Sequence, residues 1–178
     1  MIRDATVRNL SFAALALLAS IATHAQSPAP AVGCDSPESH QMDFWLGEWH
    51  AEYVMKGVKG VSRNRITKTL DGCAILEEFT GAPGMALDGR SYSVYDRNAG
   101  AWKQTWVDNQ GGYLDFTGAV VDGNRVFARE FQRQGRTTKQ RMVFRDVKPD
   151  AFKWLWQSST DGGATWSTAW EIDYRRVK

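Results

Sequence analysis

Ten residues of this chain have types and positions that fit the binding or conversion of a small molecule. Each is aromatic or polar, and most fall beside other aromatic residues in a period-two pattern. Small-molecule pockets are mostly apolar and carry a few polar groups that orient the ligand. The candidate ligand-binding residues are Tyr53, Glu78, Tyr95, Gln104, Trp106, Asp108, Tyr113, Arg141, Trp154 and Trp156.

Three functions use these residues in different ways. In the first, the indole rings are flat walls that bind a small hydrophobic or aromatic molecule. In the second, Asp108, Asp115 or Glu78 is the general base of a cofactor-free isomerase, cyclase or lyase. Tyr113 or Arg141 would then stabilise the enolate-like charge, and a carboxylate against indole has a raised pKa that suits proton transfer. In the third, the side chains fill the core of a non-catalytic envelope interaction module.

Metal, haem and nucleophile chemistry find little support in the sequence. Beyond residue 25 the histidines are His40 and His50, and no histidine follows residue 50. A zinc site of the usual His and Cys composition, or a haem held by a late-strand histidine, would therefore lack its ligands. The chain has no Gly-x-Ser-x-Gly motif and no Gly-rich phosphate loop before a helix. We expect neither a metal nor another cofactor.

Short β-strands must position the candidate residues. After Gly47 the apolar residues alternate with period two, and turn pairs such as Asp71-Gly72 and Asp122-Gly123 separate the runs. Links of two to five residues favour antiparallel neighbours, since a parallel crossover needs about a dozen residues. The predicted strands are 49–56, 61–70, 73–79, 90–96, 101–109, 112–120, 125–131, 136–147, 151–158 and 166–176.

The strand pattern predicts an all-β fold, a single antiparallel meander of about ten strands that closes into a barrel. Closure removes the unpaired edges that a meander would otherwise expose, and an open sandwich is the alternative. A short helix is expected before the first strand, with Ser36 as its cap, Pro37 at its first position and Gly47 at its end.

Alternation predicts that the aromatic face of each strand is the interior face. The clearest inner sets are Trp49, Ala51, Tyr53 and Met55; Trp102, Gln104, Trp106 and Asp108; Phe152, Trp154 and Trp156; and Trp166, Thr168, Trp170, Ile172 and Tyr174. The Gly/Pro-rich link 80–89 is either a flap that touches a ligand through Met85 and Leu87 or an ordinary surface loop.

Three sets of motifs resemble those of known proteins. Gly47-Glu48-Trp49 resembles the Gly-x-Trp start of lipocalin-type (calycin) barrels. The resemblance implies that Trp49 plugs the closed end and that Arg175 or Arg176 of the last strand lies across its indole, to whose face a guanidinium is attracted.

Longer segments resemble an uncharacterised family of secreted bacterial proteins, a domain of unknown function. They are Met42-Asp-Phe-Trp-Leu-Gly-Glu-Trp49, Trp102-Lys-Gln-Thr-Trp-Val-Asp-Asn109 and Met142-Val-Phe-Arg-Asp146. This resemblance extends over nearly all of residues 34–175. It implies a lipocalin-like barrel and brings no established activity.

The segment from Ser159 to Trp166 resembles the Asp-box, Ser-x-Asp-x-Gly-x-Thr-Trp, of sialidases and other propellers. The motif occurs once, which excludes a propeller built of repeats. We expect a structural role, in which Asp161 accepts hydrogen bonds from turn amides and Trp166 covers the turn.

The N-terminal segment predicts export. Residues 1–25 resemble a secretory signal peptide, with Arg3 and Arg8 before an apolar run that ends at Ala22, and cleavage is expected after Ala25. An uncleaved anchor is the alternative, although the run is shorter than the roughly 20 residues that span a bilayer. Residues 26–35 would then be a flexible leader, and residues 36–178 the barrel domain of a soluble periplasmic or secreted protein.

Cysteine usage and net charge agree with this assignment. Cys34 and Cys73 are the two cysteines, and an oxidising compartment favours a disulfide between them over a catalytic thiol. Lys and Arg number 22 against 20 Asp and Glu, and this near balance disfavours a nucleic-acid partner. The expected partner is a small hydrophobic or aromatic molecule, and nothing in the sequence indicates an oligomeric state.

Overall fold

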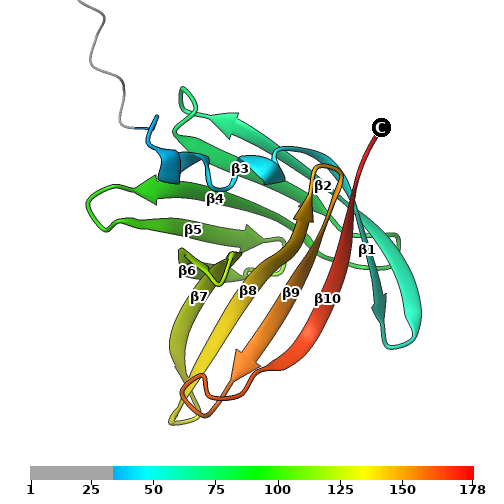
Figure 1. Ribbon diagram of the computed structural model, residues 1–178. Helices are drawn as coiled ribbons and strands as arrows, with labels where there is room; N and C mark the ends of the chain where they lie inside the picture. The colour runs from blue at the N-terminus through cyan, green and yellow to red at the C-terminus, as the bar shows by residue number, and fades with distance from the viewer. Residues whose placement is uncertain (1–33) are drawn as a thin grey trace, which may run out of the picture. The chain divides into compact units, whose positions relative to one another are not determined.

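A computed structural model describes residues 34–178, which form a closed barrel of ten antiparallel strands (Figure 1). Each strand pairs with the next along the chain, and β1 pairs with β10 to complete the ring. The strands are β1 (Gly47–Met55), β2 (Val58–Thr69), β3 (Ala74–Thr80), β4 (Asp88–Asp96), β5 (Ala101–Asp108), β6 (Tyr113–Val121), β7 (Asn124–Arg133), β8 (Arg136–Lys148), β9 (Ala151–Ser159) and β10 (Ser167–Arg176). The predicted signal peptide, and all of the predicted leader before Cys34, lie outside the described residues.

The prediction of an antiparallel all-β barrel is confirmed, and the barrel is closed rather than an open sandwich. Tight turns join most of the strands. Between β6 and β7, Asp122 and Gly123 both have positive φ, at 49° and 77°. Two successive positive φ angles are typical of the type I′ turn. The backbone twist of this turn matches the twist of the two strands that it joins. Local sequence at the turns therefore enforces the meander order.

The predicted short helix before the first strand is confirmed, and it consists of two 3₁₀ segments, η1 (Pro37–His40) and η2 (Asp43–Trp45). Ser36 caps the first, accepting a hydrogen bond from the Ser39 amide at 3.4 Å. Met42 and Trp45 are both fully buried. A 3₁₀ helix places residues three apart on one face, so both side chains can point into the core. Gly47 begins β1 rather than ending the helix.

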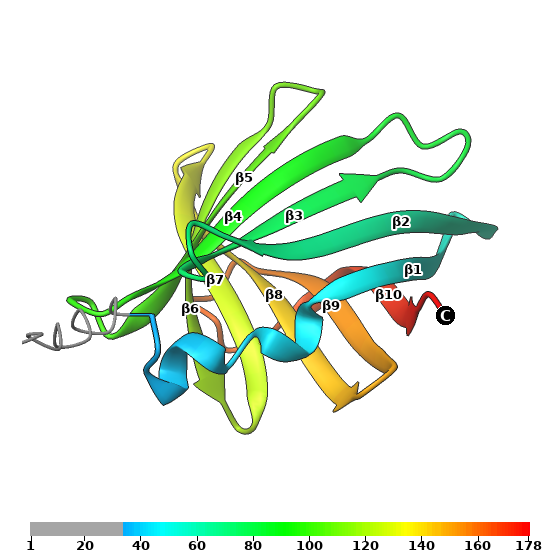
Figure 2. The same ribbon diagram turned by 90° about the horizontal axis from the view of Figure 1, so that it is seen from above.

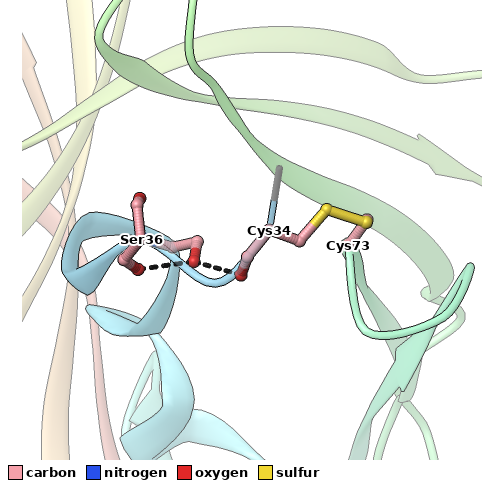
Figure 3. The surroundings of a disulfide bond; sticks show 4 residues. Cys34, Ser36 and Cys73 are labelled. Atoms are coloured by element: carbon pink, nitrogen blue, oxygen red, sulfur yellow. Dashed lines mark hydrogen bonds between the residues drawn. A yellow bond between two sulfur atoms is a disulfide. The ribbon is translucent and has the colours of Figure 1, made fainter. Parts of the chain in front are cut away.

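A disulfide fastens this helical segment to the barrel. Cys34 and Cys73 are joined, with their Cα atoms 5.0 Å apart (Figure 3). The Ser39 hydroxyl donates to the carbonyl oxygens of Cys34 and Ser36, which holds the chain beside the bridge. Because Cys73 lies between β2 and β3, the bridge fixes η1 across one end of the barrel.

Trp49 and Arg176 close that end. The Trp49 side chain is 1% exposed, and its Nε1 donates to the Trp45 carbonyl at 2.8 Å. The Arg176 guanidinium lies 4.2 Å from the centroid of the Trp49 ring, and its Nη1 donates to the Leu46 carbonyl at 2.8 Å. Of the two candidate arginines it is therefore Arg176 that covers Trp49, whereas Arg175 is exposed.

At the other end the barrel separates into two sheets. β1 pairs with β10 only between Trp49 and Glu52, and β6 pairs with β7 only from Thr117 onward. The first six strands thus form one continuous sheet and the last four a second one, joined along two short seams at the closed end (Figure 2). The divergence of the sheets leaves space inside the barrel.

The β9–β10 turn holds the Asp-box. The Asp161 carboxylate accepts hydrogen bonds from the Ser159 hydroxyl at 2.7 Å and from the Thr165 amide at 3.0 Å, and these bonds lower its pKa. Trp166 Nε1 donates to the Gly163 carbonyl at 3.0 Å. The prediction that Trp166 and Thr168 face inward is wrong, because a β-bulge between Thr168 and Trp170 shifts the register.

Removal of the disulfide tests how far it stabilises the fold. The bridge joins residues 39 positions apart. By the loop-entropy argument, the Cys34→Ser/Cys73→Ser double variant should lose about 4 kcal/mol of unfolding free energy. Urea denaturation followed by tryptophan fluorescence measures this loss. An unchanged midpoint would mean that the bridge adds no net stability to the fold.

Candidate functional site

A cavity of about 240 Å³ lies in the barrel interior. Its walls come from both sheets and its floor from η2. The apolar lining residues are Trp45, Phe79, Leu87, Trp106, Leu114, Phe116, Met142, Phe144, Trp154, Trp156, Trp170 and Ile172. The polar lining residues are Glu77, Gln104, Asp108 and Tyr174. The composition is that of a small-molecule site, with apolar walls and a few polar groups.

Six aromatic rings form a belt round the cavity. In order of contact they are Trp106, Phe79, Trp170, Trp154, Trp156 and Phe116, and we call this set the aromatic belt. Successive ring centroids are 5.6–6.3 Å apart. Four of these contacts are edge-to-face, and Trp154 and Trp156 are stacked with 13° between their planes. Each ring is thus oriented by its neighbours, which makes the cavity walls rigid.

Gly89 positions the Trp106 indole. β4 pairs with β5 so that Gly89 lies beside the Trp106 side chain, and a Cβ at position 89 would overlap the indole. The glycine therefore allows this ring to lie flat against β4. Trp106 Nε1 donates to Asp108 Oδ2 at 3.0 Å, which fixes the rotation of the ring.

Asp108 and Gln104 share the inner face of β5 with Trp106, as alternation predicts. The Asp108 carboxylate also accepts from the Gly112 amide at 2.8 Å and the Gln110 amide at 2.9 Å. The Trp106 bond, followed by the Gly112 bond, lowers the pKa of Asp108. Its carboxylate therefore remains ionised and holds the β5–β6 turn. Gln104 is buried and donates to the Ser93 hydroxyl at 3.0 Å.

Glu77 is the buried carboxylate of the site. It is 8% exposed, and its two oxygens accept from Asn64 Nδ2 at 2.7 Å and from the Ser91 hydroxyl at 2.6 Å. Asn64 Nδ2 also donates to the Tyr174 hydroxyl at 3.1 Å. Burial raises the pKa of Glu77 in spite of these bonds, and burial together with the nearby Glu77 raises the pKa of Tyr174.

The prediction that Glu78 faces the interior is wrong. Glu78 points outward, where it forms ion pairs with Arg65 and Arg90. β3 has Ile75, Glu77 and Phe79 on its buried face. The rule that the aromatic face is the inner face, applied to Phe79, would have selected Glu77 instead.

Tyr113, Arg141 and Asp115 also face outward, contrary to their assignment to the cavity. Tyr113 is 64% exposed, because β6 turns Leu114 and Phe116 inward. The phenol can stay in water at little cost, whereas a phenylalanine ring cannot. Arg141 lies 3.9 Å over the Trp166 ring on the outer surface, with its Nε donating to Gln157 at 2.7 Å.

Tyr53 and Tyr95 lie on inner faces but outside the cavity. The Tyr53 hydroxyl donates to Met85 Sδ at 3.4 Å, and its ring packs edge-on against Trp170. Tyr53 also lines a separate groove where β1 and β10 diverge. Tyr95 packs against Trp102 near the closed end. From link 80–89, Leu87 lines the cavity and Met85 contacts Tyr53 instead.

Sequence reasoning placed Trp154 and Trp156 correctly beside the cavity but left Glu77, Phe79, Phe116 and Trp170 out of the candidate site. Phe116 is the clearest case, because it packs against Trp156 from the far side of the interior, at 5.9 Å between centroids. No local pattern relates β6 to β9. The pairing of faces across a barrel depends on its curvature, which a strand pattern does not contain.

No protein-family model matches the chain, and no curated protein matches it. Within residues 34–178 the helical segments are too short and too polar to cross a membrane. The described residues bring together no group of three or more His, Cys, Asp or Glu side chains that could hold a metal ion.

Replacement of Glu77 tests its protonation. Because its pKa in the folded protein is raised above the ordinary 4.5, the native state binds this proton more tightly than the unfolded state. Native stability should therefore fall as pH rises above about 4.5, through the native pKa. Glu77→Gln removes the titration, so the stability of wild type relative to this variant should decline with rising pH. Urea denaturation between about pH 4 and pH 8 measures it.

Glu78→Gln is the matched control, since the two residues are adjacent and face opposite sides of β3. The stability of this variant should still decline with rising pH, because Glu77 is unchanged in it. If Glu77→Gln and wild type show the same pH dependence, Glu77 is not protonated more readily in the folded protein.

Proposed function

We propose that this protein binds a small hydrophobic or aromatic molecule in the barrel cavity. The observation that carries the proposal is the aromatic belt, because six oriented rings enclose a space that their own side chains leave open. A protein interior is normally packed without voids larger than a water molecule. An open apolar cavity costs stability, and a bound apolar ligand recovers it.

The cavity volume sets the size of the ligand. About 240 Å³ is slightly below the range of roughly 300–1,000 Å³ that holds drug-sized ligands. A molecule of one or two rings, or a short alkyl or isoprenoid chain, matches this space. The same volume argues against the alternative of a filled barrel that serves as an interaction module.

We also propose that the protein acts outside the cytoplasm, after removal of the signal peptide. The Cys34–Cys73 disulfide supports this location, since structural disulfides persist in oxidising compartments. The mass of the denatured protein purified from cells would test it. Loss of residues 1–25 and of two hydrogens is expected, and a full-length mass would contradict it.

Binding of N-phenylnaphthylamine, a neutral aromatic probe, tests the proposed site. Saturable quenching of tryptophan fluorescence is expected, with one site per chain. Trp156→Leu removes one wall of the belt while keeping an apolar side chain, and should weaken probe binding about tenfold. Trp166→Leu is the matched control, because Trp166 lies on the outer surface beneath Arg141, and it should bind like wild type.

Folding of both variants is checked by circular dichroism and thermal unfolding. A well-folded wild-type protein that binds neither this probe nor a panel of isoprenoids and phenols would refute the proposal. Native mass spectrometry of the protein as purified then identifies the natural ligand, as extra mass that is lost on denaturation.

A cofactor-free isomerase, cyclase or lyase remains the second candidate, now centred on Glu77. Glu77 and Asp108 both line the cavity, and their pKa values are shifted in opposite directions. Such a pair of carboxylates, one raised and one lowered, is the arrangement that separates acid and base roles in several enzymes. Glu77 is the proton-transfer group in this candidate, since Asp108 is committed to the β5–β6 turn.

Proton exchange distinguishes this candidate from simple binding. A bound ligand with an acidic C–H bond, incubated in heavy water, should gain deuterium in the presence of wild type and not of Glu77→Gln. Mass spectrometry of the extracted ligand measures the exchange. Equal exchange by both proteins would exclude Glu77 as the proton-transfer group. If wild type catalyses no exchange, the enzyme candidate is refuted and only the binding function stands.

A further inference from the structure

The β7–β8 hairpin extends past its neighbour at the open end of the barrel. β7 pairs with β8 along its length from Arg125 to Arg133, but with β6 only as far as Ala128. Residues 129–133 of β7 and 113–116 of β6 therefore face each other without ladder hydrogen bonds. Leu114 and Phe116 belong to the part of β6 that does not pair with β7, and both line the cavity. The separation of β6 and β7 thus lies directly beside the ligand site.

This hairpin is strongly basic on its inner face. Alternation from the inward Phe127 and Met142 puts Arg129, Arg133 and Arg136 on the same side as the cavity. The acidic residue of the hairpin, Glu130, is on the opposite face and lies 3.5 Å from Lys139. Among residues 34–178, no carboxylate forms an ion pair with these three arginines.

Arg129 is the member of this group that reaches the aromatic belt. Its guanidinium carbon lies 5.9 Å from the centroid of Phe116 and 4.4 Å from that of Phe131. Its Nε donates to Gln140 Oε1 at 3.0 Å, and within the described part of the chain its two terminal amino groups have no hydrogen-bond acceptor. The guanidinium is held in place, with its terminal donors available.

The surroundings of Arg129 make it a site for an oxyanion. Burial lowers the pKa of this guanidinium, and the more distant carboxylate of Asp115 acts in the opposite direction. Arginine nevertheless stays charged at neutral pH. A partly dehydrated cation with two open donors gains more from a carboxylate or phosphate than an exposed one does, because a planar fork can bind two oxygens at once.

We propose that the ligand is an anionic amphiphile, whose apolar part lies within the aromatic belt and whose carboxylate or phosphate is bound by Arg129. Arg133 and Arg136 supply a positive field at the entrance. The inference rests on the proposed binding function and adds the charge and orientation of the ligand. Arg129 belongs to the hairpin at the open end, so the anionic group would face the entrance and the apolar part the closed end.

Displacement of N-phenylnaphthylamine by four matched compounds tests the inference. Decanoate and decyl phosphate carry both parts of the ligand, decanol carries the tail alone, and inorganic phosphate carries the head alone. We expect the two anionic amphiphiles to bind about tenfold more tightly than decanol, and inorganic phosphate to displace no probe. The advantage over decanol should shrink as salt concentration rises.

Variants of Arg129 locate the effect. Arg129→Gln should abolish the preference for decanoate over decanol while leaving decanol affinity unchanged, and Arg129→Lys should retain part of the preference. Arg97→Gln makes the same charge change at the β4–β5 turn, at the closed end, and should leave the preference intact. Thermal unfolding checks that each variant is folded.

The outcomes separate this inference from the function on which it rests. Equal binding of decanoate and decanol would overturn the anionic ligand, while the apolar site would stand. A preference that survives in Arg129→Gln, or displacement by inorganic phosphate alone, would also overturn it. If the protein binds the probe and none of the four compounds displaces it, the anionic ligand is refuted and the binding site stands. If the probe itself does not bind, the proposed binding function is refuted as well.

Discussion

The stacking of Arg176 on Trp49 is the contact on which the closed end of the barrel depends. β1 and β10 share only a short ladder, from Trp49 to Glu52, so strand pairing alone joins the first and last strands weakly. Arg176 strengthens this seam, since it covers the indole and donates to the carbonyls of Leu46 and Pro149 at 2.8 and 2.9 Å. These carbonyls belong to turns at the closed end that no ladder satisfies. One side chain thus joins the helical segment, β10 and the β8–β9 turn.

A firmly closed end allows the other end to open. The two sheets diverge from the seams at β1–β10 and β6–β7, and the space between them becomes the cavity. Side chains large enough to span the gap would fill it, but the aromatic belt keeps its rings along the walls, through four edge-to-face contacts and one stacked pair. The rings are thereby held against one another rather than collapsing to the centre. A rigid apolar cavity of this kind binds its ligand with little loss of side-chain entropy.

The polar groups of the cavity are arranged by charge. Glu77 is near the closed half, in a cluster with Asn64, Ser91 and Tyr174, and burial favours its neutral form. The β7–β8 hairpin brings cationic side chains to the open half. The cavity therefore has a desolvated carboxyl toward its closed end, and cationic side chains together with the ionised Asp108 toward its open end. This difference would orient a ligand, and it brings together the residues in which a binder and a proton-transfer enzyme would differ.

The sequence by itself determined the strand order, the antiparallel meander, the disulfide pairing and the inner faces of β5 and β9, because turn residues and period-two alternation are local. It also predicted closure, since a ten-strand meander would otherwise leave two exposed edges. Its errors were local. Glu78 was chosen although the aromatic-face rule, applied to Phe79, selects Glu77. The β-bulge before Trp170 reverses the faces of Trp166 and Thr168, and only the structure shows it. The cavity, the aromatic belt and the reach of Arg129 to Phe116 depend on where the two sheets separate. Those features were decided by tertiary structure alone, because the curvature of a closed barrel brings together side chains whose strands share no hydrogen bond.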